Sequence, residues 1–186
     1  MTRGGTIAAL DIGSSKVVCF IAHRQPSGKM KVLGIGHQIS QGIKAGIVVD
    51  IKRAEASILA AVHAAEKMAG ETIEQTLVNI SGSTLQSHQF EVETSISGQE
   101  VTDLDIARIL RQGEQQFNQH DVEIFHAIPG GYCIDDTEGI HDPRGMLGEK
   151  LSTVLHVITA SSTAHRNIAN CLGHCRLNIT MSIASS

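Results

Sequence analysis

The sequence predicts an α/β protein in which short apolar strands alternate with amphipathic helices. Two observations support this class: three strand-like runs open the chain, and a run with helical periodicity follows them at residues 50–68. A third is that strand and helix patterns keep alternating up to residue 183. A chain of 186 residues can form one domain or two small ones.

The first three strands are expected at residues 7–10, 16–22 and 30–38, because each run is rich in Val, Ile or Leu. Gly13 and the turn-forming cluster at residues 25–28 separate them. We therefore expect a three-stranded antiparallel meander.

The helix predicted at residues 50–68 has Asp50 as its cap and Gly70 as its stop. One of its faces is apolar and should cover the meander; the residues on it are Ala54, Ile58, Ala61, Ala65 and Met68. The sequence Gly34-Ile35-Gly36 lacks the third glycine and following helix of a dinucleotide fingerprint, so we interpret it as strand.

The remaining elements follow the same reasoning. Strands are expected from residue 75 through NISG and at 85–96, then a helix at 103–117 that begins at Thr102 with Asp105 close to a capping box. Strands at 122–128 and 151–159 flank a long irregular loop, and Ser161 or Ser162 opens the last helix before a strand at 177–183. The inward faces of the two helices are Ile106, Ile109, Leu110, Gly113 and Phe117, and Ala164, Ile168, Cys171, Leu172 and Cys175. A sheet ending there lacks its next crossover, so a truncated chain is expected.

Composition excludes several classes of protein. A formal charge of −4, 3% aromatic residues and no Trp do not favour a nucleic-acid partner. No apolar run approaches the ~20 residues of a membrane-spanning helix, and the amino terminus does not resemble a secretory signal, so a cytoplasmic location is expected. The four cysteines form no C-x-x-C pair and lie in apolar settings, which predicts reduced, buried thiols.

The stretch LDIGSSKVVCF at residues 10–20 is the main candidate for chemistry. Asp11 ends a strand, Gly13 permits a tight turn, and the amides and hydroxyls of Ser14 and Ser15 can converge on an anion, with Lys16 adding positive charge. Asp11 would repel a bare phosphate unless a hydrated Mg²⁺ lies between them. From this stretch alone, both a surface hairpin and a metal-nucleotide cradle remain open.

The other motifs give weaker evidence for a functional site. There is no Walker A sequence, and no two histidines stand three or four residues apart. Cys171, His174 and Cys175 share a helix but two of them lie on its apolar stripe, which favours core packing over a metal site. Ser81-Gly82-Ser83 lacks the pattern of a nucleophile elbow and is interpreted as a strand connection. No catalytic residue is assigned.

The order of segments resembles the amino-terminal part of the FtsA family of actin-like bacterial cell-division proteins. The resemblance runs from IAALDIGSSKVVCFIA through GIKAGIVVDIKRAEASILAAVHAAEKMAG, NISGSTLQS and EVTDLDIARIL to FHAIPGGYCIDDTEGIHDPRGMLGEKLSTVLHVIT. Its most specific element is the loop YCIDDTEGIHDPRGMLG. It implies an actin-like (ribonuclease H-like) fold, with subdomain 1A at residues 1–82 and 161–186. An inserted β-α-β-β subdomain 1C would occupy residues 83–160.

The resemblance also implies a site and a cofactor. Asp11 would hold the water shell of Mg²⁺, while Gly13, Ser14, Ser15 and Lys16 would contact the phosphates of ATP. The family's other nucleotide-binding segments fall beyond residue 186, so we expect ATP to raise the melting temperature of this chain little or not at all.

The implied function is that of an ATP-binding adaptor, at most a weak ATPase, that polymerises and links the FtsZ ring to the inner face of the cytoplasmic membrane. FtsZ would bind a part of the protein beyond these residues, and lipid would bind a carboxy-terminal helix also beyond them. Self-association would use 1A and 1C, and later division proteins would bind 1C. A PilM-like pilus-assembly protein and a kinase of the actin and sugar-kinase superfamily are the alternatives.

Overall fold

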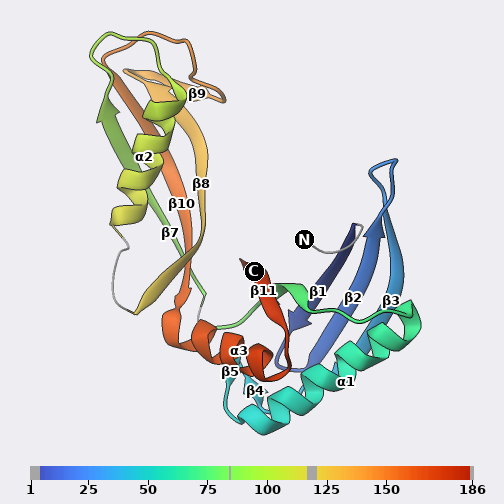
Figure 1. The fold of residues 1–186 in the computed structure, drawn as a ribbon. Helices are drawn as coiled ribbons and strands as arrows, with labels where there is room; N and C mark the ends of the chain where they lie inside the picture. The colour runs from blue at the N-terminus through green and yellow to red at the C-terminus, as the bar shows by residue number, and fades with distance from the viewer. Residues whose placement is uncertain (1–4, 84, 117–120, 185–186) are drawn as a thin grey trace. The chain divides into compact units, whose positions relative to one another are not determined.

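The computed structural model describes residues 5–83, 85–116 and 121–184, and the chain divides into two compact units. The discontinuous unit comprises residues 1–85 and 162–186, and the inserted unit comprises residues 86–161 (Figure 1). Among the described residues, the discontinuous unit has a main sheet with two helices and the inserted unit has a sheet with one helix; each is described by itself below.

The discontinuous unit contains a five-stranded mixed sheet. Strands β1 (Thr6–Ile12), β2 (Lys16–Arg24) and β3 (Met30–Ile39) pair antiparallel in sequence order, which confirms the predicted meander. Strand β6 (Gln75–Ile80) pairs parallel with β1, and β11 (Asn178–Ala184) pairs parallel with β6, so the order is β11-β6-β1-β2-β3. A separate ladder of two short strands, β4 (Ile43–Lys44) and β5 (Ile47–Val48), precedes the first helix.

Helix α1 (Ile51–Ala69) begins and ends as the sequence predicts. The carboxylate of Asp50 accepts a hydrogen bond from the Arg53 amide at 3.1 Å, and Gly70 ends the helix with a φ of 74°. Four of the predicted inward residues are buried, but Met68 is 65% exposed, so the prediction was wrong for that residue. The contact stripe continues at i+4 spacing from Ala61 through Ala65 to Ala69, which lies against Gly34, and Met68 falls outside it.

Glycine allows α1 to lie unusually close to β3. A Cβ atom added to Gly36 would stand 1.9 Å from the Ala61 carbonyl oxygen, and one added to Gly34 would stand 2.1 Å from the Ala65 carbonyl oxygen. No side chain larger than hydrogen fits at either position. Residues 34–36 lie within β3, which confirms that they are strand, and the close approach of α1 explains why glycine occupies positions 34 and 36.

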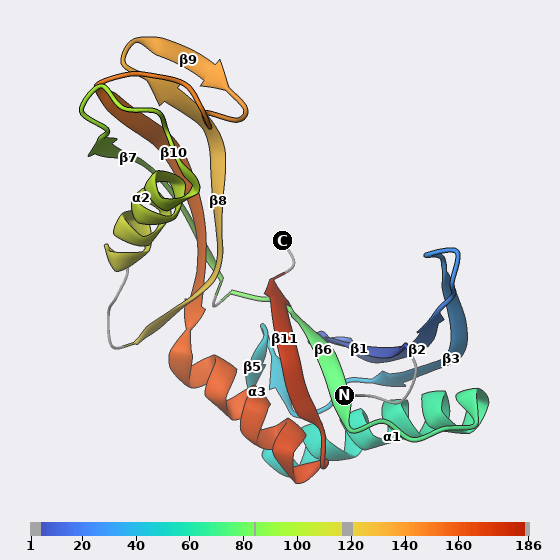
Figure 2. The same ribbon diagram turned by 45° about the horizontal axis from the view of Figure 1, so that its top comes forward.

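Helix α3 (Ser162–His174) lies on the same face of the sheet as α1 (Figure 2). It begins at the second of the two predicted serines, and Ala164, Ile168, Cys171 and Leu172 are buried. Cys175 is also buried, although the helix ends one residue earlier. Cys19 is buried beneath α1 as well, whereas Cys133 in the inserted unit is only partly buried.

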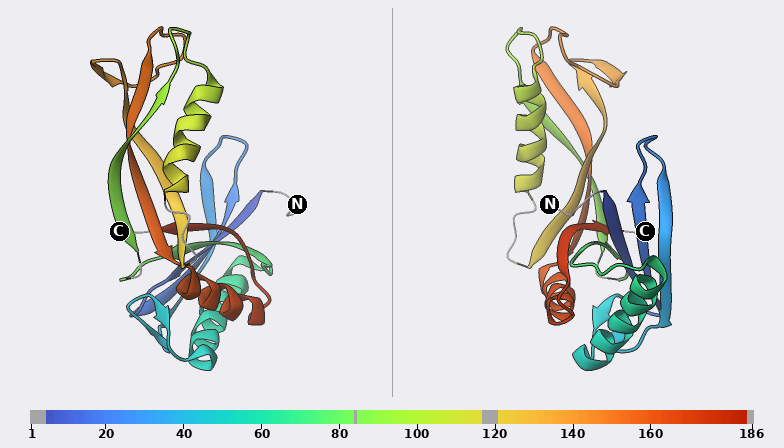
Figure 3. Two further views of the ribbon diagram at one scale, coloured as in Figure 1. Left: turned by 90° about the vertical axis from the view of Figure 1, so that its left-hand side faces the viewer. Right: turned by 45° about the vertical axis from the view of Figure 1, so that its right-hand side comes forward.

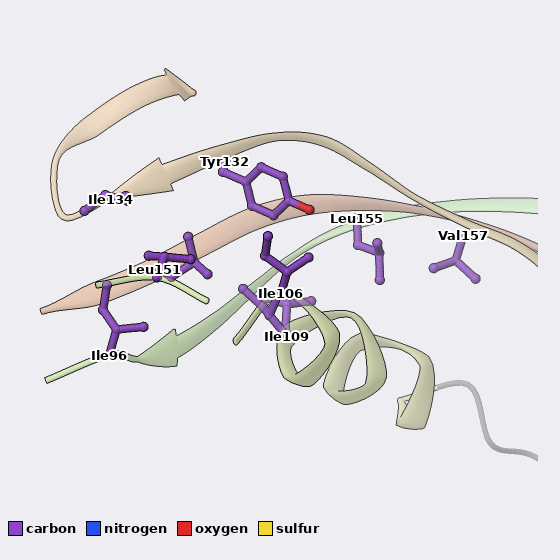
Figure 4. Close-up of a cluster of buried hydrophobic side chains, with 10 residues drawn as sticks. Ile96, Ile106, Ile109, Tyr132, Ile134, Leu151, Leu155 and Val157 are labelled. Carbon is purple, nitrogen blue, oxygen red and sulfur yellow. The ribbon is translucent and has the colours of Figure 1, made fainter. Parts of the chain in front are cut away.

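The inserted unit is a four-stranded antiparallel sheet with one covering helix. Its elements are β7 (Gln86–Ser95), α2 (Asp103–Gln115), β8 (Val122–Ile134), β9 (Thr137–Ile140) and β10 (Lys150–Ser161). The strand order is β7-β10-β8-β9, and α2 runs along one face of the sheet (Figure 3). Ile106 and Ile109 of α2 meet Leu151, Leu155 and Val157 of β10 in a buried apolar cluster (Figure 4).

Two expectations for the inserted unit need comment. The irregular loop predicted between residues 128 and 151 was wrong in its first half, because β8 continues to Ile134 and β9 follows it. A register irregularity in the β8–β10 pairing, between Thr153 and Leu155, lets the strand continue across Gly130 and Gly131. Helix α2 is confirmed to Gln115, and Phe117 lies outside the described residues.

Among the helices that the structure describes, none is both long enough and apolar enough to cross a membrane.

Candidate phosphate-binding site

The candidate site is the tight turn between β1 and β2. The Gly13 amide donates a hydrogen bond to the Lys16 carbonyl oxygen at 3.0 Å and closes the turn. Ser14, Ser15 and Lys16 are exposed at its tip, and Asp11 is half-buried one residue before the end of β1. The structure therefore places all five predicted site residues on one hairpin, with the polar groups of the turn open to solvent.

Asp11 is held by a neighbouring strand. Because β6 runs parallel to β1, Asn79 lies directly opposite Asp11, and its side-chain amide donates to Asp11 Oδ1 at 2.9 Å. Among the described residues, the structure records no hydrogen bond to the other carboxylate oxygen, Oδ2. That oxygen can therefore accept a hydrogen bond from a ligand. Asn79 was missed in the sequence analysis; its only signal is a polar residue inside the apolar run TLVNI.

The Ser14 hydroxyl is also oriented. Its oxygen accepts a hydrogen bond from the Gly46 amide at 3.1 Å. Because a hydroxyl can accept and donate at the same time, this contact occupies a lone pair and leaves the O–H free to donate. Ser14 is thus a pre-oriented donor that suits an anionic oxygen.

The turn between β4 and β5, which contains Gly46, is itself held by the segment at residues 81–83. The Ala45 carbonyl oxygen accepts from both the amide and the hydroxyl of Ser83, each at 3.2 Å. Gly46 has a φ of 79°, and a Cβ atom there would stand 2.2 Å from the Ser81 carbonyl oxygen. The turn between β4 and β5 is therefore fixed against residues 81–83, which lie between β6 and β7 as predicted.

These contacts gather oxygen and amide groups at the ends of β1 and β6. A free carboxylate oxygen suits a water molecule bound to Mg²⁺, a hard cation that prefers oxygen ligands and keeps several waters. Turn amides, a hydroxyl donor and an ammonium group suit phosphate oxygens. The donor set thus fits a phosphate with its magnesium ion.

Comparisons with known proteins show what the chain is similar to. A family model described as "SHS2 domain inserted in FTSA" matches residues 82–159. The cell division protein FtsA of Agrobacterium fabrum is 36% identical over 98% of this chain and 44% of its own length. The cell division protein FtsA of Pseudomonas aeruginosa is 35% identical over 95% of this chain and 42% of its own length.

A solved structure supports the fold. The chain matches a structure titled "PilM-PilN type IV pilus biogenesis complex" with a TM-score of 0.66 and 12% identity, over 96% of this chain and 47% of that one. The fold, with an insertion after β6 and a polar hairpin between β1 and β2, is that of an actin-like protein. The chain is similar to FtsA proteins along nearly its whole length, and it spans less than half the length of the curated relatives it matches.

Proposed function

We propose that this chain forms the ATP-binding half of an actin-like cell-division adaptor. The observation that carries the proposal is the β1–β2 hairpin, where Asp11 is oriented by Asn79 and the Ser14 hydroxyl by Gly46. Two independent contacts hold these groups in position at the end of the sheet before any ligand binds. That preorganisation supports a binding site over an ordinary surface turn.

In this proposal each residue has a defined role. Asp11 holds the water shell of the magnesium ion through its free oxygen, while the amides of Ser14 and Ser15, their hydroxyls and Lys16 bind the phosphates, and Gly13 lets the turn approach them closely. The magnesium ion supplies charge neutralisation when bound. In this proposal the complete protein hydrolyses ATP at most slowly.

The relatives' printed name, cell division protein FtsA, supports a role in cell division. We infer that the complete protein polymerises, links the FtsZ ring to the cytoplasmic face of the inner membrane and helps to recruit later division proteins. The discontinuous unit would be subdomain 1A and the inserted unit subdomain 1C. Contacts with FtsZ and lipid would lie in segments beyond these residues.

A pilus-assembly role is the alternative, because a structure of PilM with PilN shares the fold. That match has 12% identity, whereas FtsA relatives reach 36% along nearly the whole chain. The identity therefore favours the division role. A kinase role has no supporting residue in the described site.

The test uses a protein that carries this sequence at the length of its curated relatives, with anionic lipid vesicles. We expect ATP to cause co-sedimentation of the wild-type protein with vesicles as polymer, and Asp11→Ala to abolish the ATP-dependent part. Lys52→Ala, an exposed change in α1, is the control. Unchanged ATP-dependent assembly of Asp11→Ala would remove Asp11 from the mechanism.

A further inference from the structure

The two units carry opposite charge. Thirteen of the 19 Asp and Glu residues lie in the inserted unit with only 4 of the 15 Lys and Arg residues, which gives that unit a formal charge of −9. The discontinuous unit holds the other 6 acidic and 11 basic residues, for a formal charge of +5. The modest total of −4 conceals this asymmetry.

The inserted unit presents one sheet face on which α2 does not lie. Side chains that alternate with the core residues share this face: Glu91 lies opposite Val154, and Ile128 lies opposite His156. Ile128 is 52% exposed and Val154 is 51% exposed. A hollow of about 310 Å³ opens at Val154 and is lined also by Glu91, Glu138 and Cys133 among others. We name this surface the acidic face.

The carboxylates of the acidic face differ in whether they are paired with a cation of the same unit. Glu93 is paired with Lys150 at 3.1 Å. Glu91 and Glu138 line the hollow itself and are both exposed. A ligand for this surface therefore needs an apolar group to meet Ile128 and Val154 and a cation to meet Glu91 and Glu138.

The discontinuous unit offers that combination at the tip of the β2–β3 hairpin. Arg24 lies opposite Met30 at the last pair of the hairpin, and Lys29 precedes Met30 in the turn. Met30 is 47% exposed, and Val32, on the same side of β3, is 50% exposed. We name Arg24, Lys29, Met30 and Val32 the cationic tip.

We propose that the cationic tip of one copy docks on the acidic face of a second copy. This inference gives residues to the self-association within the proposed function and rests on that part of it. Contacts between two inserted units, or between two discontinuous units, bring like charges together and are disfavoured. A contact between unlike units is favoured and is heterologous, so each docked copy leaves a free tip and a free face. Repetition of the contact builds an open chain.

The test is sedimentation velocity of this 186-residue chain without nucleotide. At low ionic strength we expect the average mass to rise with concentration, and about 0.5 M NaCl to return the chain to monomer because salt screens exposed charges. Two double variants remove the charges on one side of the contact: Arg24→Gln/Lys29→Gln and Glu91→Gln/Glu138→Gln. Each should raise the dissociation constant of self-association about tenfold or more. Control pairs on the same units, Lys44→Gln/Lys52→Gln and Glu100→Gln/Glu114→Gln, should change it little.

Mixing the two neutralised variants gives the sharpest result. Each retains one working half of the contact, so the equimolar mixture should form dimers and nothing larger. A monomeric wild-type chain at low salt, a monomeric mixture, or equal losses in the control pairs would each overturn the proposal. Asp11→Ala should associate like wild type in this assay, so a failed nucleotide site and a failed contact give different results.

Discussion

Asp11 and Asn79 show how a single residue can prepare a site before its ligand arrives. The Asn79 amide holds one carboxylate oxygen of Asp11 at 2.9 Å and thereby fixes the direction in which the other oxygen can accept a hydrogen bond. In our account that second oxygen meets a water of the magnesium shell. Asn79 is then a positioning residue, which acts on the metal only through Asp11.

We predict that Asn79→Ala weakens binding of magnesium-ATP about tenfold in a protein of the curated relatives' length, since a hydrogen bond to a charged group is worth roughly 1.5–3 kcal/mol. Binding of ATP without magnesium should not change. Calorimetric titrations with and without Mg²⁺ measure both constants, with Asn170→Ala on the exposed side of α3 as the control. Equal weakening in both titrations would show that Asn79 serves only the fold.

Sequence alone could find the hairpin but not its supports. Residues 11–16 are consecutive, so one short pattern shows their chemistry. Asn79 and Gly46 reach the site through strand pairing and a turn contact, 68 and 32 residues away from their partners. Nothing in the local pattern of either residue indicates those contacts, because they depend on the parallel register of β1 and β6 and on the path of residues 42–50.

At the scale of elements, the start of α2 is fixed by a capping contact. The Asp105 carboxylate accepts from the Thr102 amide at 2.9 Å and from the Thr102 hydroxyl at 2.6 Å, as the predicted capping box implies. These bonds, with a smaller effect from Arg108, hold the pKa of Asp105 below its ordinary value of 3.8. A lowered pKa in the folded chain means that the charged carboxylate stabilises the fold.

We predict that Asp105→Ala lowers the free energy of unfolding of the inserted unit by about 1 kcal/mol at pH 7. The contribution is present above the ordinary carboxyl pKa and is lost as pH falls through the lowered value, so the variant and wild type should converge in acid. Tyr132, the single Tyr of a chain without Trp, lies in this unit's core, so its fluorescence during urea unfolding reports the transition. A difference that persists unchanged at pH 2, or a similar loss in Gln112→Ala, would contradict this.

The contact between α1 and β3 depends on the absence of side chains. We predict that Gly36→Ala destabilises the discontinuous unit by about 1–3 kcal/mol or more, since the new Cβ would stand 1.9 Å from the Ala61 carbonyl oxygen. Gly173→Ala in α3 is the matched control, because nothing lies within 4 Å of its Cβ position, and it should be neutral or stabilising. Thermal unfolding followed by circular dichroism compares them. Equal stability of Gly36→Ala and wild type would contradict the packing.

Helix positions could be read from the sequence more fully than strand ends. Caps at Asp50, Gly70 and Thr102 mark α1 and α2, because capping chemistry is local. The predicted strand ended at residue 128, before Pro129-Gly130-Gly131, yet cross-strand pairing with β10 carries β8 through these residues to Ile134. Strands β4 and β5, with two residues each, are too short to leave a pattern.

At the scale of the whole molecule, each unit has a core of its own. The apolar cluster of the inserted unit is drawn entirely from residues 90–157, and α1 and α3 cover the sheet of the discontinuous unit. The family resemblance implies an insertion, and in the structure the chain leaves one sheet after β6 and returns to it at β11. Which side chains each core contains follows from the pairing of strands.

We predict that the two units unfold separately. Gly36→Ala should lower the midpoint of the transition seen by circular dichroism and leave the Tyr132 fluorescence transition where it is. Asp105→Ala should lower the midpoint of the Tyr132 fluorescence transition and leave the midpoint seen by circular dichroism where it is. A common shift of both signals in either variant would show that the units unfold as one cooperative body.

The central claim is that the β1–β2 hairpin binds the phosphates of magnesium-ATP. A crystal structure of a protein of the relatives' length with a slowly hydrolysed ATP analogue and Mg²⁺ tests it most directly. We expect phosphate oxygens within hydrogen-bonding distance of the amides of Ser14 and Ser15 and a magnesium-bound water on the free oxygen of Asp11. Phosphates bound elsewhere, with the hairpin still holding only its contacts to Asn79 and Gly46, would contradict the claim.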